Sequence, residues 1–276
     1  MSESTNGSSF RVCESLTTVP KFVIAASNSS ERFLQFSKSA ANIHLRDICR
    51  VQADLAGQCD RHVEVVIGTS HRKVWQHIVQ ENIPFALVFE DDALGTISPD
   101  FCDKIHQLAA DRSTSSFDVA RLHSFKSDRH PEVIISNGSN GNLELIDHDK
   151  GCAAFGAAGY AITLRGARLS LEAWTKDVGF PVDHYFAYSA VKNGEMKVKC
   201  VIPPIFDVQR VNSYRKQPSM PHAFRAQDDE NHGYYTQKEK YSVVAGRRSD
   251  IANGRNQGVG DCADPLLMEQ CADFKQ

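Results

Sequence analysis

Several features that mark whole classes of protein are missing from this sequence of 276 residues. No apolar run approaches the ~20 residues that a membrane-spanning helix needs. The first residues do not follow the basic-then-apolar layout of a secretory signal. The formal net charge is only −3, which makes no general case for nucleic-acid binding. The sequence therefore predicts a cytoplasmic protein that binds no nucleic acid.

Cysteine motifs are also lacking. The eight cysteines form no Cys-x-x-Cys pair and no cluster with histidine, so neither a zinc site nor a redox motif is indicated. We expect these cysteines to be reduced thiols.

The composition predicts one folded domain with loose ends. With 41% apolar residues, the chain can bury one substantial core. Residues 1–18 are rich in Ser and Thr and predict a disordered leader, residues 19–245 form the predicted domain, and residues 246–276 form a flexible tail.

Charge is unevenly distributed along the chain. The stretch Lys192–Arg248 carries 11 Lys or Arg against 6 Asp or Glu. It suits an anionic partner such as a sugar diphosphate, a phosphorylated glycolipid or a membrane surface, which would allow peripheral membrane contact. A solvated basic face without a partner fits the pattern equally well.

The most informative stretch runs from Pro84 to Ala93. Five consecutive apolar residues, Phe85–Phe89, predict a central strand that is buried on both faces. Glu90, Asp91 and Asp92 follow directly, at the strand end where ligands of open α/β sheets bind. Three neighbouring carboxylates repel one another, and a divalent cation would neutralise them. The plainer alternative is a solvated loop or a helix cap.

The remaining pattern predicts an α/β fold. Residues 19–26 predict a first strand, and a helix begins near Glu31 after a Ser-rich cap. Residues 63–67 predict a second strand, broken by Gly68, with a helix from Thr69 or Ser70 that leads to the acidic strand. This order predicts a parallel pair of strands. Further strands are expected within 117–122, 156–163 and 197–202.

Two single residues allow two interpretations each. His71 lies near the ligand edge of the predicted sheet or is a surface histidine beside a helix cap. Asp183, after Pro181, stands where a helix N-cap belongs, and its spacing alone favours that role.

Five short motifs occur in order along the chain and together resemble glycosyltransferase family 25, the lipopolysaccharide-type and collagen-type galactosyltransferases. No single motif is specific for this family, but five motifs in the same order and at compatible spacing are specific for it. The motifs are Gly68-Thr69-Ser70-His71 with Trp75, Leu87–Asp92, Phe117–Leu122, Gly159–Thr163 and Pro181-Val182-Asp183-His184.

The resemblance implies a GT-A-like, Rossmann-like fold with a mixed, mainly parallel sheet flanked by helices. It also implies that residues 19–245 are a catalytic domain that transfers a hexose, most often galactose from UDP-galactose, with inversion at the anomeric carbon. The acceptor would be a glycan or a glycolipid such as lipopolysaccharide, and the cofactor a divalent cation, usually Mn²⁺.

Roles for individual residues follow from the same resemblance. Asp92 is the predicted direct metal ligand, with Glu90 or Asp91 sharing the metal. Asp183 is the predicted catalytic base, with Glu90 as the second catalytic carboxylate. The predicted donor-binding residues are Arg32, Ser70, His71, Asp91 and His184.

Two other classes of function also fit the pattern. The chain could be a non-catalytic domain that binds a nucleotide sugar or a glycan, or it could be a metal-dependent phosphohydrolase, since carboxylates at a strand end suit both. Incubation with UDP-galactose and Mn²⁺ without an acceptor separates them. A hydrolase would cleave the donor rapidly, a transferase slowly, and a binding domain not at all.

Overall fold

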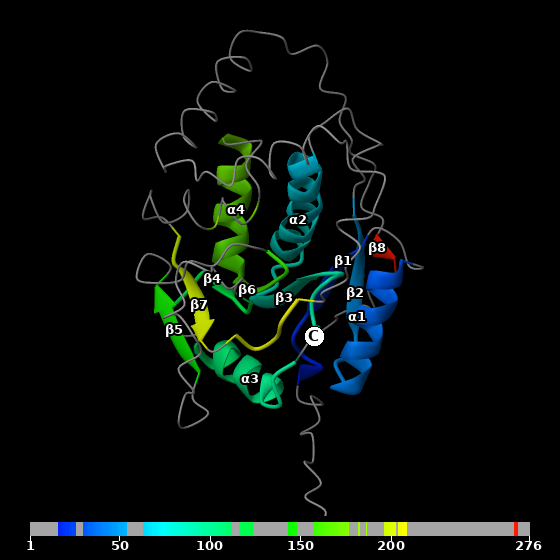
Figure 1. Ribbon diagram of the computed structural model, residues 1–276. Coiled ribbons are helices and arrows are strands. Elements are labelled where there is room, and N and C mark those ends of the chain that lie inside the picture. Colours follow the sequence, from blue (N-terminus) through cyan, green and yellow to red (C-terminus); the bar gives the residue numbers. More distant parts are fainter. Residues whose placement is uncertain are drawn as a thin grey trace, which may run out of the picture. The chain divides into compact units, whose positions relative to one another are not determined.

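The computed structural model contains a mixed eight-stranded sheet with helices on both faces (Figure 1). The structure describes residues 16–25, 30–53, 63–95, 97–111, 116–123, 143–147, 157–176, 182, 186, 196–202, 204–208 and 268–269. All of these belong to one compact unit, which comprises residues 1–210 and 266–276. No helix in these ranges is long and apolar enough to cross a membrane.

The strand order in the sheet is β5-β7-β4-β6-β3-β1-β2-β8. The strands are β1 (Lys21–Ala25), β2 (Ile48–Gln52), β3 (Phe85–Glu90), β4 (Val119–Arg121), β5 (Glu144–Asp147), β6 (Gly159–Thr163), β7 (Val198–Ile202) and β8 (Met268–Glu269). β1 is parallel to both β2 and β3, and β4 is parallel to β7. β6 lies antiparallel between β3 and β4. The predicted mixed α/β sheet is therefore confirmed.

β3 is the central strand that the apolar run predicts. Its first five residues are fully buried, and only Glu90 at its end is partly exposed. Alternate side chains enter two separate cores: Phe85, Leu87 and Phe89 on one face, Ala86 and Val88 on the other. Both faces are covered, which explains why the run is continuously apolar.

Two pairs of helices cover these two faces (Figure 1). α1 (Glu31–Asn42) and α3 (Phe101–Asp111) contribute apolar side chains to the core that contains Phe89. α2 (Val63–Gln80) and α4 (Leu164–Lys176) contribute to the core that contains Val88. α1 begins as predicted, because the Ser30 hydroxyl accepts a hydrogen bond from the Phe33 N–H and so caps the helix.

The predicted strand over residues 63–67 is wrong. α2 begins at Val63 and continues through Gly68, so His71 lies well inside the helix and not in its first turn. A short apolar run does not by itself distinguish a strand from a buried helix, and β-branched residues only weakly disfavour a helix. The second strand is β2, which pairs with β1, so β1 separates it from β3.

Glycines allow close approach of neighbouring segments in β6 and α4. A Cβ atom on Gly166 would lie 2.3 Å from the carbonyl oxygen of Asp118. One on Gly159 would lie 2.4 Å from the Phe206 ring. These glycines let α4 and the segment after β7 pack directly against β4 and β6.

The prediction of reduced thiols is wrong for the described cysteines. Cys49 in β2, Cys102 in α3 and Cys200 in β7 are all disulfide-bonded. Disulfide formation requires two Cα atoms within about 7 Å, which depends on the folded chain and not on sequence spacing. The absence of Cys-x-x-Cys pairs therefore excludes a redox motif but not structural disulfides.

Reduction is expected to destabilise the protein. Each native disulfide typically contributes about 2–4 kcal/mol, so TCEP should lower the melting temperature clearly. Alkylation of denatured but unreduced protein, followed by peptide mass spectrometry, should leave Cys49, Cys102 and Cys200 unmodified. The same procedure after TCEP is the control, and alkylation of all three without reduction would contradict the structure.

Candidate active site

The acidic cluster lies at the edge of the sheet where β1, β3 and β4 end and the antiparallel β6 begins. Glu90 is the last residue of β3, and Asp91 and Asp92 form the turn after it. The Glu90 N–H donates to the Ala158 carbonyl and the Ala93 N–H donates to the Glu90 carbonyl, which fixes the backbone on both sides. The three carboxylates thus occupy a rigid position at the ligand edge of the sheet.

Arg32 in α1 joins two of these carboxylates. Its Nη2 lies 2.6 Å from Asp91 Oδ1 and 3.2 Å from Asp92 Oδ2. Arg32 is one of the predicted donor-binding residues, and the structure places it directly at the acidic cluster. α1 positions it there because Ser30 caps the helix two residues earlier.

Asp92 is the most perturbed carboxyl group of the site. Burial, then the charge of Glu90, raises its pKa to about 7, although Arg32 opposes the shift and Asp91 adds to it. Among the side chains that the structure describes, Asp92 Oδ1 is a buried oxygen without a hydrogen-bond partner. Among the described residues, the three carboxylates of this cluster therefore outnumber the Arg32 guanidinium that contacts two of them.

These observations bear on the predicted metal. A buried carboxylate oxygen without a donor, beside two further carboxylates, is the hard oxygen chemistry that Mn²⁺ or Mg²⁺ accepts. Within the described ranges, no group of three or more His, Cys, Asp or Glu side chains is placed to hold a metal ion. A metal ion at this site would therefore be held by Asp92, by Glu90 or Asp91, and by oxygen atoms of the bound substrate.

Glu90 is held from the other side of the sheet. His71 Nε2 lies 3.2 Å from Glu90 Oε1, and His71 Nδ1 lies 2.9 Å from the Tyr160 hydroxyl. His71 is fully buried and Ser70 nearly so. Their predicted contact with the donor stays a prediction, because the structure shows both ring nitrogens of His71 engaged by protein groups.

Three residues at this edge were not predicted as site residues. They are Arg121 at the end of β4, His123 two residues later and Tyr160 in β6. His123 stacks on Phe206, and burial lowers the pKa of its imidazole despite a hydrogen bond to the Phe206 carbonyl. For Arg121 and His123 the sequence does carry a signal, because polar residues that end or follow a buried strand face the ligand edge. Tyr160 lies at the start of the antiparallel strand β6 and lacks this signal.

Asp118 has a structural role. Arg165 Nη1 donates to both of its oxygens, at 2.8 and 2.6 Å, and the Lys197 N–H donates to Oδ2 at 2.8 Å. The carboxylate is 4% exposed. It links β4 to α4 and to the start of β7.

Asp183 and His184 lie outside the described residues, so their predicted roles stay predictions. Their described neighbours Val182 and Phe186 are buried in the core on the α2 side of the sheet. Phe186 packs against Tyr160 with ring centroids 5.1 Å apart, and against Trp75 at 5.9 Å. Phe186 therefore contacts Tyr160, whose hydroxyl lies within hydrogen-bond distance of His71.

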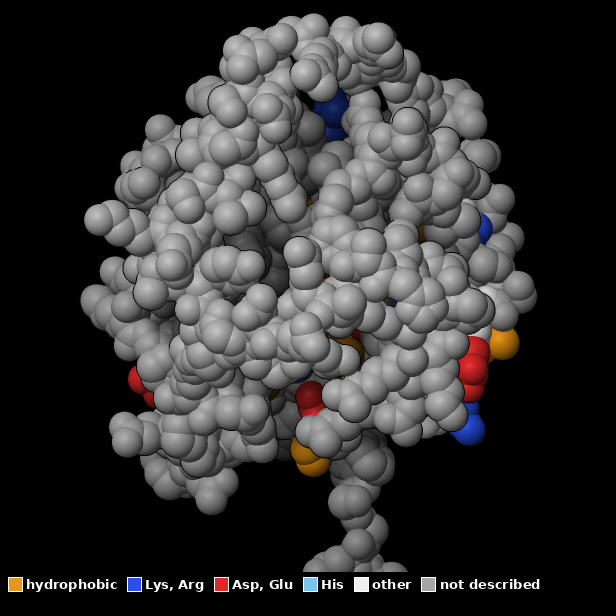
Figure 2. All heavy atoms as spheres, turned by 45° about the horizontal axis from the view of Figure 1, so that its top comes forward, with side chains coloured by type: hydrophobic (Ala, Val, Ile, Leu, Met, Phe, Trp, Pro, Cys, Tyr) orange, Lys and Arg blue, Asp and Glu red, His pale blue; other side chains and the backbone are white. Residues whose placement is uncertain are grey.

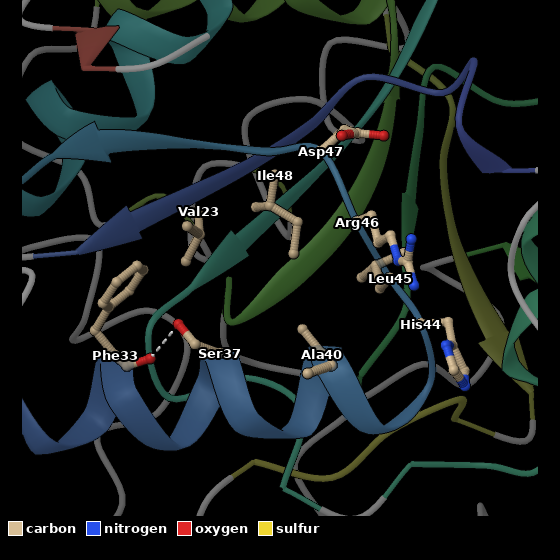
Figure 3. A pocket seen from close by; sticks show the side chains of 10 residues that line it. Val23, Phe33, Ser37, Ala40, His44, Leu45, Arg46, Asp47 and Ile48 are labelled. Atoms are coloured by element: carbon tan, nitrogen blue, oxygen red, sulfur yellow. Dashed lines mark hydrogen bonds between the residues drawn. The ribbon is translucent and has the colours of Figure 1, made fainter. Parts of the chain in front are cut away.

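A separate pocket of about 480 Å³ lies between α1 and the strands β1 and β2 (Figure 3). Val23, Phe33, Ala40 and Leu45 form its apolar part, and His44, Arg46 and Asp47 stand at one end. Glu90, Asp91 and Asp92 do not line this pocket. It opens at the start of β2, whereas the carboxylates lie at the end of β3.

The described surface offers little apolar area. Leu34 and Ile67 are the exposed large hydrophobic residues in the described ranges. On the face shown in Figure 2, the visible hydrophobic side chains occur as isolated spots, and acidic and basic side chains lie next to each other at its edge. The described residues on this face therefore form no broad apolar patch.

Comparison with known proteins agrees with the motifs. Residues 67–186 match the model of glycosyltransferase family 25, described as an LPS biosynthesis protein family. The matched segment runs from α2 to Phe186 and contains the acidic cluster, His71, Asp118 and Tyr160. No curated protein sequence matches the chain. The predicted resemblance is confirmed, and the chain is similar to glycosyltransferases over this segment.

Proposed function

We propose, on the match of residues 67–186 to glycosyltransferase family 25, that this protein is an inverting hexosyltransferase. The donor is a UDP-sugar, with UDP-galactose first among the candidates, and the acceptor is a glycan or a glycolipid such as lipopolysaccharide. The observation that supports the proposal most directly is the acidic cluster at the ligand edge of the α/β sheet. Burial raises the pKa of Asp92 there, and its Oδ1 is a buried oxygen without a hydrogen-bond partner among the described residues.

The chemistry that this site must supply is mainly electrostatic. When a sugar leaves its nucleotide, negative charge develops on the diphosphate, and stabilising that charge is a large part of catalysis. A divalent cation, held by Asp92 with Glu90 or Asp91, would supply this stabilisation when bound. Arg32, which contacts both aspartates, is the described cationic group nearest to them and holds their carboxylates in place.

Inversion also needs a carboxylate that accepts the proton of the attacking hydroxyl. Asp183 is proposed for this role because of its motif, and Glu90 is the second candidate because its side chain is partly exposed at the site. The oxygen of the acceptor attacks the anomeric carbon while the bond to the UDP oxygen breaks. The proton passes to the carboxylate, and UDP leaves with the bonding electrons.

The test is a thermal-shift and turnover series on the full chain. UDP-galactose, UDP-glucose and UDP are each added with Mn²⁺ or with EDTA, since a ligand at 100 times its Kd adds ~2.7 kcal/mol to stability. We expect the largest shift with UDP-galactose and Mn²⁺, and slow release of UDP without an acceptor. Rapid hydrolysis would favour the phosphohydrolase alternative. Binding without turnover on an acceptor panel would favour the binding-domain alternative.

The disulfides bear on where this reaction takes place. The sequence predicts a cytoplasmic location, but the three described cysteines are disulfide-bonded, and disulfides are rare in cytoplasmic proteins. Disulfides persist in oxidising compartments such as the periplasm or the endoplasmic reticulum. We therefore favour an oxidising compartment over the cytoplasm. Peripheral contact of the basic stretch Lys192–Arg248 with an anionic membrane remains part of the proposal.

A further inference from the structure

A buried chain of hydrogen bonds leads from the interior of the protein to Glu90. Trp75 Nε1 donates to the Tyr160 hydroxyl at 2.9 Å, the hydroxyl lies 2.9 Å from His71 Nδ1, and His71 Nε2 lies 3.2 Å from Glu90 Oε1. Trp75 and His71 are fully buried and Tyr160 is 1% exposed, whereas the Glu90 side chain is 25% exposed. The chain thus begins in the core and ends at the candidate site.

The direction of each bond follows from the chemistry of the groups. An indole N–H can only donate, so the Tyr160 oxygen accepts from Trp75. The Tyr160 proton is buried and needs an acceptor, and we assign this role to His71 Nδ1, which lies 2.9 Å away. Nδ1 must then be an acceptor, which leaves the ring proton on Nε2, where it is donated to Glu90. Burial raises the pKa of the Tyr160 hydroxyl, so it remains a donor at neutral pH.

The fold holds the members of this chain in fixed positions. His71 and Trp75 are four residues apart and therefore lie on the same face of α2. Tyr160 pairs with Val88, two residues before Glu90, so its side chain lies on the same face of the sheet. The ring of Phe186 packs on both Trp75 and Tyr160 and fills the space beside them.

The carboxylate at the end of the chain is held by one oxygen. His71 engages Glu90 Oε1, and within the described ranges no hydrogen bond engages Oε2. A purely structural network would satisfy the indole and the phenol on backbone carbonyls or on each other. This network instead ends on the partly exposed carboxylate of Glu90, which belongs to the acidic cluster.

We propose that His71, Tyr160 and Trp75 are positioning residues that fix the Glu90 carboxylate through Oε1 and leave Oε2 to the reacting groups. This inference rests on the proposed transferase function and names residues that serve it. Fixed orientation matters because a carboxylate that must reorient in each turnover loses the advantage of preorganisation.

The first test compares two substitutions in the same packing environment. Tyr160→Phe keeps the ring and removes the hydroxyl that joins Trp75 to His71. Phe186→Leu changes the packing of the same rings and removes no hydrogen-bonding group. We expect Tyr160→Phe to lower kcat about tenfold with the KM for UDP-galactose within about twofold. Phe186→Leu should lower the melting temperature and leave kcat within about twofold.

The second test asks whether a donor at the position of His71 Nε2 is sufficient. His71→Gln can place an amide N–H toward Glu90 Oε1, and His71→Leu cannot. We expect His71→Gln to retain at least about tenfold more kcat than His71→Leu. Equal loss in both variants, at similar melting temperatures, would show that His71 only fills space.

The third test is independent of enzymatic activity. In ¹⁵N-histidine-labelled wild-type protein, with His71 assigned from its loss in His71→Gln, the ring should be the Nε2–H tautomer, and its Nε2–H signal should shift in Glu90→Gln. If wild type transfers no sugar but shows this tautomer and this shift, the proposed function fails and the positioning of Glu90 stands. An Nδ1–H tautomer, or a kcat for Tyr160→Phe no lower than for Phe186→Leu, would overturn the inference.

Discussion

Asp92→Asn is expected to abolish transfer, to within the detection limit, and at the same time to raise the stability of the metal-free protein at neutral pH. The amide has nearly the shape of the carboxylate but supplies no charge to hold a cation. Asp92→Ala should have the same effect on transfer. The fold should persist in both, because Asp92 follows the end of β3 and belongs to neither apolar core.

The gain in stability follows from the raised pKa of Asp92. Its pKa of about 7 in the folded protein exceeds the ordinary value of 3.8, because burial and the charge of Glu90 disfavour the ionised form. The folded state therefore binds more protons than the unfolded state between these pH values. The contribution of Asp92 to the free energy of unfolding is fully present below about pH 4, and it is lost as the pH rises to about 7. An uncharged side chain avoids that loss.

The expected size of the effect is modest. The difference between the two pKa values corresponds to ~4 kcal/mol at most. Arg32 loses one of its two carboxylate partners in the variant, which offsets part of this gain. We expect a net ~1–2 kcal/mol at pH 8, or a melting temperature a few degrees above that of wild type in EDTA.

The measurement is thermal melting of Asp92→Asn and wild type in EDTA at pH 5 and pH 8, together with turnover. Added Mn²⁺ should stabilise wild type and not the variant. The difference between their melting temperatures should therefore become smaller or change sign. Glu144→Gln, which removes an exposed carboxylate on the edge strand β5, is the matched control and should change none of these values. A folded Asp92→Ala enzyme with near-normal Mn²⁺-dependent turnover would refute the metal assignment.

Asp183→Asn is expected to lower kcat by about 10²–10⁴-fold and to leave the melting temperature near that of wild type. Asparagine caps a helix as well as aspartate does, so a role limited to capping would leave activity largely intact. It cannot accept a proton at neutral pH, so a catalytic base would be lost. The variant should still bind UDP-galactose and Mn²⁺, which a thermal-shift measurement would detect.

Glu90→Gln is the matched comparison for Asp183→Asn. If Asp183→Asn kept most of its activity and Glu90→Gln lost it, the base would be Glu90. Asp118 is not an alternative base, because Arg165 engages both of its oxygens and the side chain is 4% exposed. The structure thereby limits the candidates for the base, among the carboxylates considered, to Asp183 and Glu90.

The sequence predicted correctly the parts of the fold that local pattern controls. The run Phe85–Phe89 predicted a central strand, because a strand that is covered on both faces is apolar at every position. Ser30 predicted the start of α1, because a hydroxyl before a helix satisfies a free N–H group. The ordered motifs predicted the family resemblance that the match over residues 67–186 confirms.

The errors lie where local pattern is ambiguous. Four of the five residues 63–67 are β-branched and apolar, yet the segment forms the start of α2, because β-branched residues disfavour a helix only weakly. β2, with its alternating burial, was not recognised, so the neighbour of β1 was misplaced. The disulfide state of Cys49, Cys102 and Cys200 depends on distances across the fold, which spacing in the sequence does not contain.

By itself, the sequence determined that three carboxylates follow a buried central strand, because hydrophobic periodicity is a local property that one segment carries alone. It could not determine which side chains meet these carboxylates. Arg32 reaches Asp91 and Asp92 from α1, and the path from Trp75 through Tyr160 and His71 to Glu90 joins a helix to two antiparallel strands. Only the tertiary structure decided these contacts, because they depend on how α1, α2 and β6 pack around β3, and residues up to 89 positions apart in the chain become hydrogen-bond partners.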